Sequence, residues 1–97
     1  MISPFKLSGE WILYYKMDYF LYYDVAHIQI EYEEESIRFE DHFGDKGKCI
    51  IEGNKVSLIY ESGIIYEGYC DYIGSYMSGV IMGPNNLRGE WQATRKE

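Results

Sequence analysis

The residues best suited to chemistry form one small group, Asp41, His42 and Asp45, which lies near a turn. A carboxylate beside a histidine serves as a general acid–base pair or as part of a metal site. A metal site needs three or four convergent ligands, and His27 and His42 are not spaced along the chain as a metal pair. We therefore interpret the group as a solvated acidic turn, and we expect no bound metal and no cofactor.

Cys49 is a candidate nucleophile, but a reactive thiolate needs a nearby histidine and an electropositive setting. The chain has 16 acidic and 9 basic side chains, and it contains no Gly-x-Ser-x-Gly elbow and no phosphate-binding glycine loop. Core packing is the alternative role for Cys49, and we expect Cys49 and Cys70 to be reduced core residues rather than a disulfide. We therefore expect a protein that is not an enzyme.

The net charge of −7 disfavours nucleic-acid binding, which needs clustered lysine and arginine. The acidic run at Glu31 and Glu33–Glu35 has three interpretations: it attracts a basic partner, it forms part of a surface that imitates phosphate spacing, or it makes a solubilising hairpin tip. No segment is long and apolar enough to span a bilayer, so we expect no membrane association. Residues 1–6 do not have the pattern of a signal peptide, and we expect a cytoplasmic protein.

Clusters of turn residues separate short segments at regular intervals, which is typical of a β-meander. No segment has a convincing helical period, and nothing resembles a linker, so residues 1–97 are predicted to form one domain. Segment 17–23 is open to three interpretations: an extended strand, a short helical turn, or a cap on one end of the barrel. The eight predicted strands are residues 8–16, 24–32, 36–41, 48–52, 55–61, 64–71, 76–82 and 87–95.

Alternation along these strands predicts which side chains face the core, because successive residues point to opposite faces. The outward face carries apolar residues on the later strands, and with Ile12 and Tyr14 these would form one stripe. A contiguous apolar patch usually marks an interface. The alternatives are that the inward and outward faces of one strand are exchanged by a shift of one residue, or that segment 17–23 covers the patch. The predicted interface residues are Ile59, Ile65, Tyr69, Val80 and Met82. The predicted inward residues are Trp11, Leu13, Tyr15, Ile28, Ile30, Tyr32, Ile37, Phe39, Val56, Leu58, Tyr60, Ile64, Tyr66, Cys70, Met77, Ile81, Trp91 and Ala93, with Cys49 and Ile51 beside them.

A glycine recurs inside the strands, at Gly9, Gly68, Gly79 and Gly89. Glycine weakens a strand, so a recurring one indicates a bend, a bulge or a close approach of two backbones. Such positions curve a meander toward closure.

Gly9-Glu10-Trp11, at the start of the first strand, resembles the Gly-x-Trp motif of the calycin superfamily of lipocalins, fatty-acid-binding proteins and avidins. The resemblance in strand pattern covers the whole chain, but only a few residues are identical to those of the family. It implies an all-β, antiparallel up-and-down meander closed into a small eight-stranded, lipocalin/avidin-like barrel. It also implies that a basic side chain of the last strand packs across that tryptophan, and Arg95 has the required parity. The chain departs from the family in its short length and tight hairpins, and we expect no long lid loop and no helical cap.

An eight-stranded barrel is filled by its own side chains or holds one small ligand, and both alternatives remain open here. The first functional hypothesis is non-enzymatic binding of a small apolar or aromatic ligand at one barrel mouth. Its walls are predicted to be Trp11, Tyr15, Tyr32, Tyr66 and Trp91, with Arg95 closing the far end. Tyrosines of segment 14–23 offer another lining for the mouth. The alternative hypothesis is a protein-interaction module, a homodimer or a small acidic inhibitor, that acts through the outer stripe.

Overall fold

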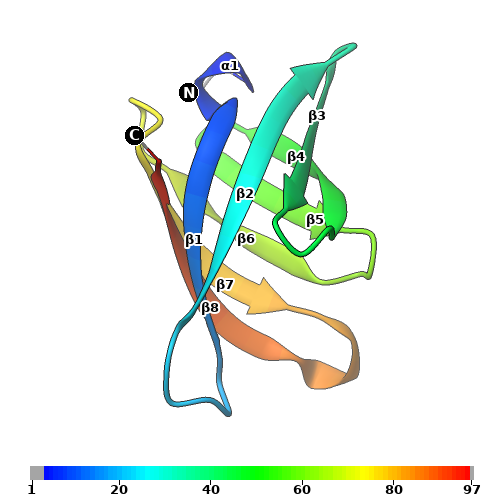
Figure 1. The fold of residues 1–97 in the computed structure, drawn as a ribbon, viewed down its shortest axis with the longest axis vertical. Helices are drawn as coiled ribbons and strands as arrows, with labels where there is room; N and C mark the ends of the chain where they lie inside the picture. The colour runs from blue at the N-terminus through cyan, green and yellow to red at the C-terminus, as the bar shows by residue number, and fades with distance from the viewer. Residues whose placement is uncertain (1–3, 97) are drawn as a thin grey trace.

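The computed structural model describes residues 4–96 and shows an antiparallel barrel in which each strand pairs with the next and the last pairs with the first (Figure 1). All eight predicted strands are present, with ends within two residues of those predicted. The elements are α1 (Pro4–Leu7), β1 (Gly9–Met17), β2 (Asp24–Glu33), β3 (Ser36–Asp41), β4 (Lys46–Glu52), β5 (Lys55–Tyr60), β6 (Ile65–Cys70), β7 (Tyr76–Met82), the single 3-10 turn η1 (Pro84–Asn86) and β8 (Arg88–Arg95).

The core lies inside the barrel, and the alternation predicted for each strand is confirmed. On β3 the burial pattern alternates strictly between exposed and buried, and β2 does the same over most of its length. Every residue predicted to face inward is buried or half-buried, including Cys49 and Ile51. Cys49 and Cys70 are free thiols in this core. Most of the barrel interior is therefore filled by its own side chains.

Two of the recurrent glycines permit a close approach between β6 and β7, where Gly68 and Gly79 are paired. A Cβ atom on Gly79 would overlap the Glu67 carbonyl oxygen, and one on Gly68 would overlap the Ser78 carbonyl oxygen. The indole N–H of Trp91, on β8, donates to the same Glu67 carbonyl at 3.3 Å. The glycines thus bring the two backbones together beneath the Trp91 side chain.

One end of the barrel, which we call the capped end, is closed by α1. Leu7 is fully buried, and its carbonyl oxygen accepts a 2.9 Å hydrogen bond from the indole N–H of Trp11. The expectation of no helical cap was wrong, because a single turn of four residues is too short to leave a helical period in the sequence. No helix among residues 4–96 has the length and apolar character needed to cross a membrane.

Segment 17–23 extends β1 by Met17 alone, contains no helix and does not cap the barrel. Met17 ends β1, and residues 18–23 form a loop that projects from the opposite end of the barrel (Figure 1). Leu21 and Tyr22 are 86% and 82% exposed. The loop is anchored at its base, where the amide of Phe20 donates to the Met17 carbonyl and Lys16 Nζ donates to the Phe20 carbonyl.

Candidate ligand site at the barrel mouth

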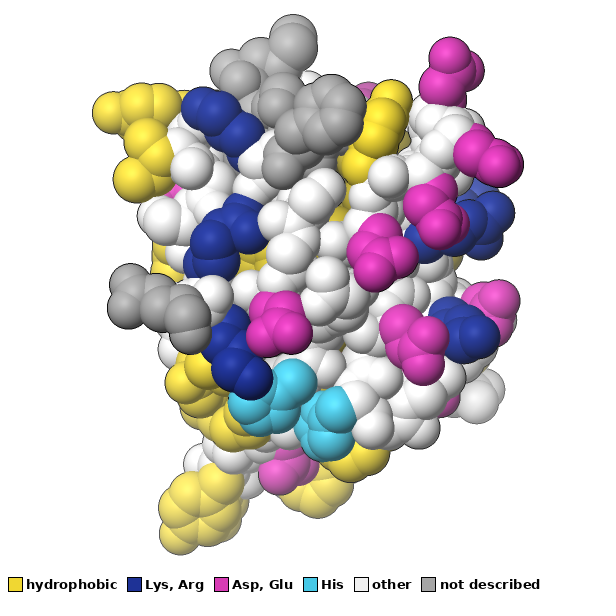
Figure 2. Space-filling model, turned by 45° about the horizontal axis from the view of Figure 1, so that its top comes forward, with side chains coloured by type: hydrophobic (Ala, Val, Ile, Leu, Met, Phe, Trp, Pro, Cys, Tyr) yellow, Lys and Arg dark blue, Asp and Glu magenta, His cyan; other side chains and the backbone are white. Residues whose placement is uncertain are grey.

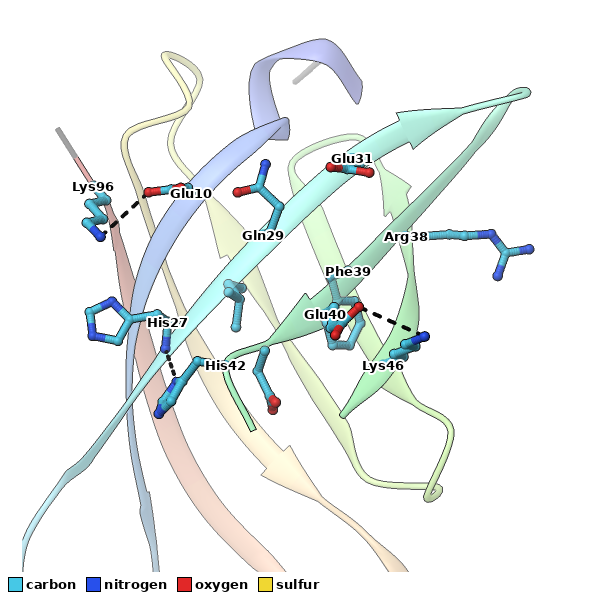
Figure 3. Close-up of a pocket in the computed structure, with 13 residues that line it drawn as sticks. Glu10, His27, Gln29, Glu31, Arg38, Phe39, Glu40, His42, Lys46 and Lys96 are labelled. Carbon is cyan, nitrogen blue, oxygen red and sulfur yellow. Dashed lines mark hydrogen bonds and ion pairs between the residues drawn. The ribbon is translucent and has the colours of Figure 1, made fainter. Parts of the chain in front are cut away.

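One hollow, about 430 Å³, lies on the outer surface of β1–β4 (Figure 3). Charges of both signs line it, and two opposite pairs meet: Lys96 with Glu10 at 3.6 Å and Lys46 with Glu40 at 4.0 Å. Figure 2 shows lysine, arginine, aspartate and glutamate side chains interspersed on this face. The electrostatic potential in the hollow therefore has no single sign. Most of the side chains that line it are exposed to solvent.

The β2–β3 register brings the two histidines together in this hollow, which their 15-residue separation in the chain did not predict. The backbone N–H of His27 donates to His42 Nδ1 at 2.9 Å, and the two rings meet edge to face with centroids 5.4 Å apart. This contact occupies Nδ1 of His42 as an acceptor. Within residues 4–96, no three histidine, cysteine or acidic side chains converge as metal ligands.

The second hollow, about 320 Å³, opens at the end of the barrel opposite α1, which we call the mouth. It lies where β1 ends and where the β3–β4 and β5–β6 turns meet. Strand alternation aims aromatic residues of β1, β5 and β6 into it. Its lining residues are Tyr15, Met17, Ala26, Asp41, Phe43, Asp45, Tyr60, Ser62, Ile64 and Tyr66.

Three tyrosine rings form the wall of the mouth cavity. The ring centroid of Tyr66 lies 5.5 Å from that of Tyr60 and 6.5 Å from that of Tyr15. Behind them, Phe39 meets Tyr60 edge to face at 4.8 Å, and Trp91 lies 5.8 Å from Tyr66. Tilted contacts of this kind hold aromatic rings in fixed orientations. The wall is therefore supported from the core.

Asp41 is the one buried charged residue among those described, at 6% exposed, and it ends β3 at the edge of the cavity. Its Oδ1 accepts hydrogen bonds from the backbone N–H groups of Phe43 and Asp45, each at 3.0 Å. Its Oδ2 accepts the Tyr60 hydroxyl at 3.1 Å. An aspartate at the start of a tight turn commonly binds backbone amides in this way, and Gly44, with φ +91°, completes the turn. The side chain is thus held rigidly by its own turn and by β5.

This setting favours the neutral phenols. Burial, followed by the charges of Asp24 and Asp41, raises the pKa of Tyr15. Burial is also the main cause that raises the pKa of Tyr60 and Tyr66, and the Asp41 carboxylate adds to both shifts. All three hydroxyls therefore remain protonated near neutral pH, and the Tyr60 hydroxyl uses its proton in the hydrogen bond to Asp41.

The predicted ligand-binding residues divide between the two ends. Tyr15 and Tyr66 line the mouth cavity, and Trp91 supports Tyr66 from behind. Trp11 is fully buried at the capped end, where the Arg95 guanidinium lies 4.5 Å from its ring centroid, the arrangement that the calycin resemblance implies. Tyr32, near the β2–β3 hairpin, packs against the core and lines neither hollow.

Sequence reasoning did not assign Asp41 or Tyr60 to the ligand site. Tyr60 was predicted to face inward, but Asp41 was interpreted as part of a solvated turn, and this was wrong because its side chain is buried. A signal was present, since Asp41 follows Ile37 and Phe39 at the inward spacing of β3. Within segment 14–23, only Tyr15 and Met17 line the cavity, and the aromatic residues 19–23 are exposed.

The outer apolar residues do not form one continuous stripe. Ile59, Ile65 and Met82 are neighbours across β5, β6 and β7. Val80 instead lies between Glu67 and Glu90, and Tyr69 lies between Lys55 and Ser78. Across the closure, Ile12 and Tyr14 pair with Thr94 and Gln92 of β8. Polar side chains thus separate the row on β5–β7 from β1.

No protein-family model matches the chain, and no curated protein matches its sequence. Among solved structures, the chain is similar to a redesigned β-barrel, with a TM-score of 0.74 and 12% sequence identity. The alignment covers 97% of this chain and 95% of the other. At this identity the similarity shows the fold: a small, closed, eight-stranded antiparallel β-barrel.

Proposed function

We propose that the barrel binds a small ligand with an apolar or aromatic body in the mouth cavity and catalyses no reaction. The observation that carries the proposal is the cavity of about 320 Å³ walled by Tyr15, Tyr60 and Tyr66, in a barrel whose interior is mostly filled by core side chains. Concave sites with aromatic walls and a few fixed polar groups are typical of small-molecule binding.

The rigid support of the cavity favours binding. The Tyr66 ring is held against Trp91, and Tyr60 is held between Phe39 and Asp41. A wall ordered before the ligand arrives lowers the entropic cost of binding. We also propose that the barrel is lipocalin-like and cytoplasmic. Arg95 across Trp11 at the capped end supports the first, and the free thiols of Cys49 and Cys70 support a reducing compartment.

The test is native mass spectrometry of protein purified without denaturation, followed by variants that fill the cavity. A reproducible added mass on each chain is expected. Ile64→Trp puts a large ring into the cavity and should abolish the added mass. The matched control is Ile65→Trp, the next residue, which faces outward on β6 and should retain it. A bare chain, or a mass that survives in folded Ile64→Trp, would contradict the proposal.

A second candidate is a protein-interaction module, a homodimer or an inhibitor of a larger partner. The observation that favours it is the exposure of Tyr69, 66%, and Val80, 52%, beside the apolar row of Ile59, Ile65 and Met82. Val80→Glu should then leave a folded protein that no longer self-associates in sedimentation velocity. A wild-type chain that sediments as a monomer and captures no partner would remove this candidate.

A further inference from the structure

We propose that the ligand of the mouth cavity is a cation, an amine attached to an aromatic or apolar body, and that Asp41 pairs with its positive charge. This inference rests on the proposed function, since it names the chemical class that the same cavity accepts. It is carried by three features of the cavity: the sign of its charges, its aromatic wall, and the unused acceptor capacity of Asp41.

The charges that line the cavity have one sign. Asp41 and Asp45 are both among its lining residues, and no lysine, arginine or histidine is. Asp24 lies close enough to Tyr15 that its charge acts on the phenol. The chain as a whole carries a net charge of −7. A cleft lined by charges of one sign concentrates counter-ions of the other. The cavity therefore attracts a cation and repels a carboxylate such as a fatty acid.

The buried Asp41 carboxylate lacks a cationic partner. None of the ion pairs among the described residues involves it, and its three hydrogen bonds come from two backbone amides and a phenol. A carboxylate has about four acceptor sites, so roughly one remains free. A buried carboxylate without a cationic partner raises the free energy of the folded protein. A bound ammonium group would offset that cost by pairing with Asp41.

The aromatic wall supplies the rest of a cation site. Cations bind the faces of aromatic rings within about 6 Å, most favourably where water is excluded. Tyr66 is 5% exposed and lines the cavity, yet its hydroxyl makes no hydrogen bond to another described residue. No fully buried polar side-chain atom in the described chain lacks a partner, which indicates that this hydroxyl opens onto the cavity. It offers a second acceptor in the same cavity as Asp41.

The experiment compares three probes that share one skeleton and differ in charge: 2-phenylethylamine, 2-phenylethanol and 3-phenylpropionate. Their affinities are measured by titration calorimetry at pH 7 on the wild type and on Asp41→Asn. The asparagine keeps an acceptor for the Phe43 and Asp45 amides and removes the charge. We expect the wild type to prefer the amine over the alcohol by about tenfold, with the anion weakest, and Asp41→Asn to reduce this preference to less than about threefold.

The matched control is Asp71→Asn. Asp71 also holds a turn, accepting from the Ser75 and Tyr76 amides, and that turn lies at the capped end. Removing its charge should leave the amine preference unchanged. If Asp41→Asn does not fold, Asp45→Asn removes the exposed second carboxylate and should lower the preference by about twofold. Melting curves verify that each variant is folded.

The outcomes separate the two proposals. Equal binding of the amine and the alcohol, or a preference that survives in folded Asp41→Asn, overturns the cation inference and leaves the proposed function in place. Binding of the amine that survives in Ile64→Trp places it outside the cavity and overturns the inference. Absence of binding by all three probes, together with a bare chain in native mass spectrometry, overturns both.

Discussion

The Arg95 guanidinium carbon lies 4.5 Å from the centre of the Trp11 ring, at the opposite end of the barrel from the mouth. The same guanidinium donates hydrogen bonds to three carbonyl oxygens, those of Gly74 at 3.0 Å, Ser8 at 2.7 Å and Lys6. One side chain of β8 therefore joins α1, the start of β1 and the β6–β7 turn. The two ends of the barrel thus differ: α1 and Arg95 close one end, and the cavity opens at the other.

Arg95→Lys should destabilise the fold by about 2 kcal/mol, because an ammonium cannot serve three carbonyls in the plane of a guanidinium. The measurement is the free energy of unfolding in urea. Arg88→Lys is the control, since Arg88 is exposed and makes a single long contact with the Leu87 carbonyl. It should change stability by less than about 0.5 kcal/mol. Equal effects of the two substitutions would show that Arg95 does not hold the capped end.

Gly79→Ala should cost about 3 kcal/mol or more, because the new Cβ would overlap the Glu67 carbonyl oxygen and force β6 and β7 apart. Gly53→Ala is the control for the same substitution. Gly53 has a φ of +66° but open space around it, so alanine there costs about 1 kcal/mol from backbone strain alone. Thermal melting followed by circular dichroism compares them, and a milder effect at Gly79 would contradict the close approach.

Stability should fall as the pH rises above 9. Burial raises the pKa of the Cys49 thiol to about 12 and that of Cys70 to about 11, from an ordinary 9.0, and it also raises the pKa of Tyr60 and Tyr66. The folded state therefore keeps protons that the unfolded chain releases. Each such group lowers the free energy of unfolding by about 1.4 kcal/mol per pH unit while it titrates only in the unfolded chain.

Urea unfolding from pH 7 to pH 11 measures this decline. Replacing both cysteines by alanine should flatten the part between pH 9 and 10, where thiols ionise, and leave the steeper part above pH 10, where phenols ionise. A free energy of unfolding that stays constant up to pH 11 would mean that these groups are not buried as described.

Chymotrypsin should cleave the native protein first within residues 19–23, because this loop offers several exposed aromatic side chains outside the sheet. Exposed loops are the preferred sites of proteolytic nicking. Mass spectrometry of early time points identifies the bond. Phe43 and Tyr72 are the internal comparison, since they are exposed but lie in tight turns. First cleavage at Tyr15 or Tyr66 would contradict the barrel.

Strand positions and inward faces could be predicted from the sequence, since both are local properties. Ile37 and Phe39 alternate with polar neighbours, and turn residues bracket the strand, so no information from distant residues is needed. The contact between Arg95 and Trp11 was expected from the resemblance to the Gly-x-Trp motif, with the inward parity of Arg95 as support. Closure aligns the first strand with the last and brings the two together.

The candidate site could be predicted only in part, because it depends on register and on turn geometry. Asp41 meets Tyr60 across a separation of 19 residues, through the folding of β4 between their strands. The exposed aromatic loop was equally hard to predict. The composition of residues 19–23 is that of a core segment, yet the hairpin that carries it extends beyond the sheet, where nothing covers it.

The pairing of β1 with β8 also determines when a newly synthesised chain can finish folding. Each of the other seven pairings joins strands adjacent in sequence, so hairpins can form in order as the chain lengthens. The eighth pairing waits for β8, and until then β1 and the last strand formed present unpaired backbone groups that invite edge-to-edge aggregation. The two strand edges are no longer exposed once Trp91 and Ala93 pair with Tyr15 and Leu13, because a closed barrel has no edge.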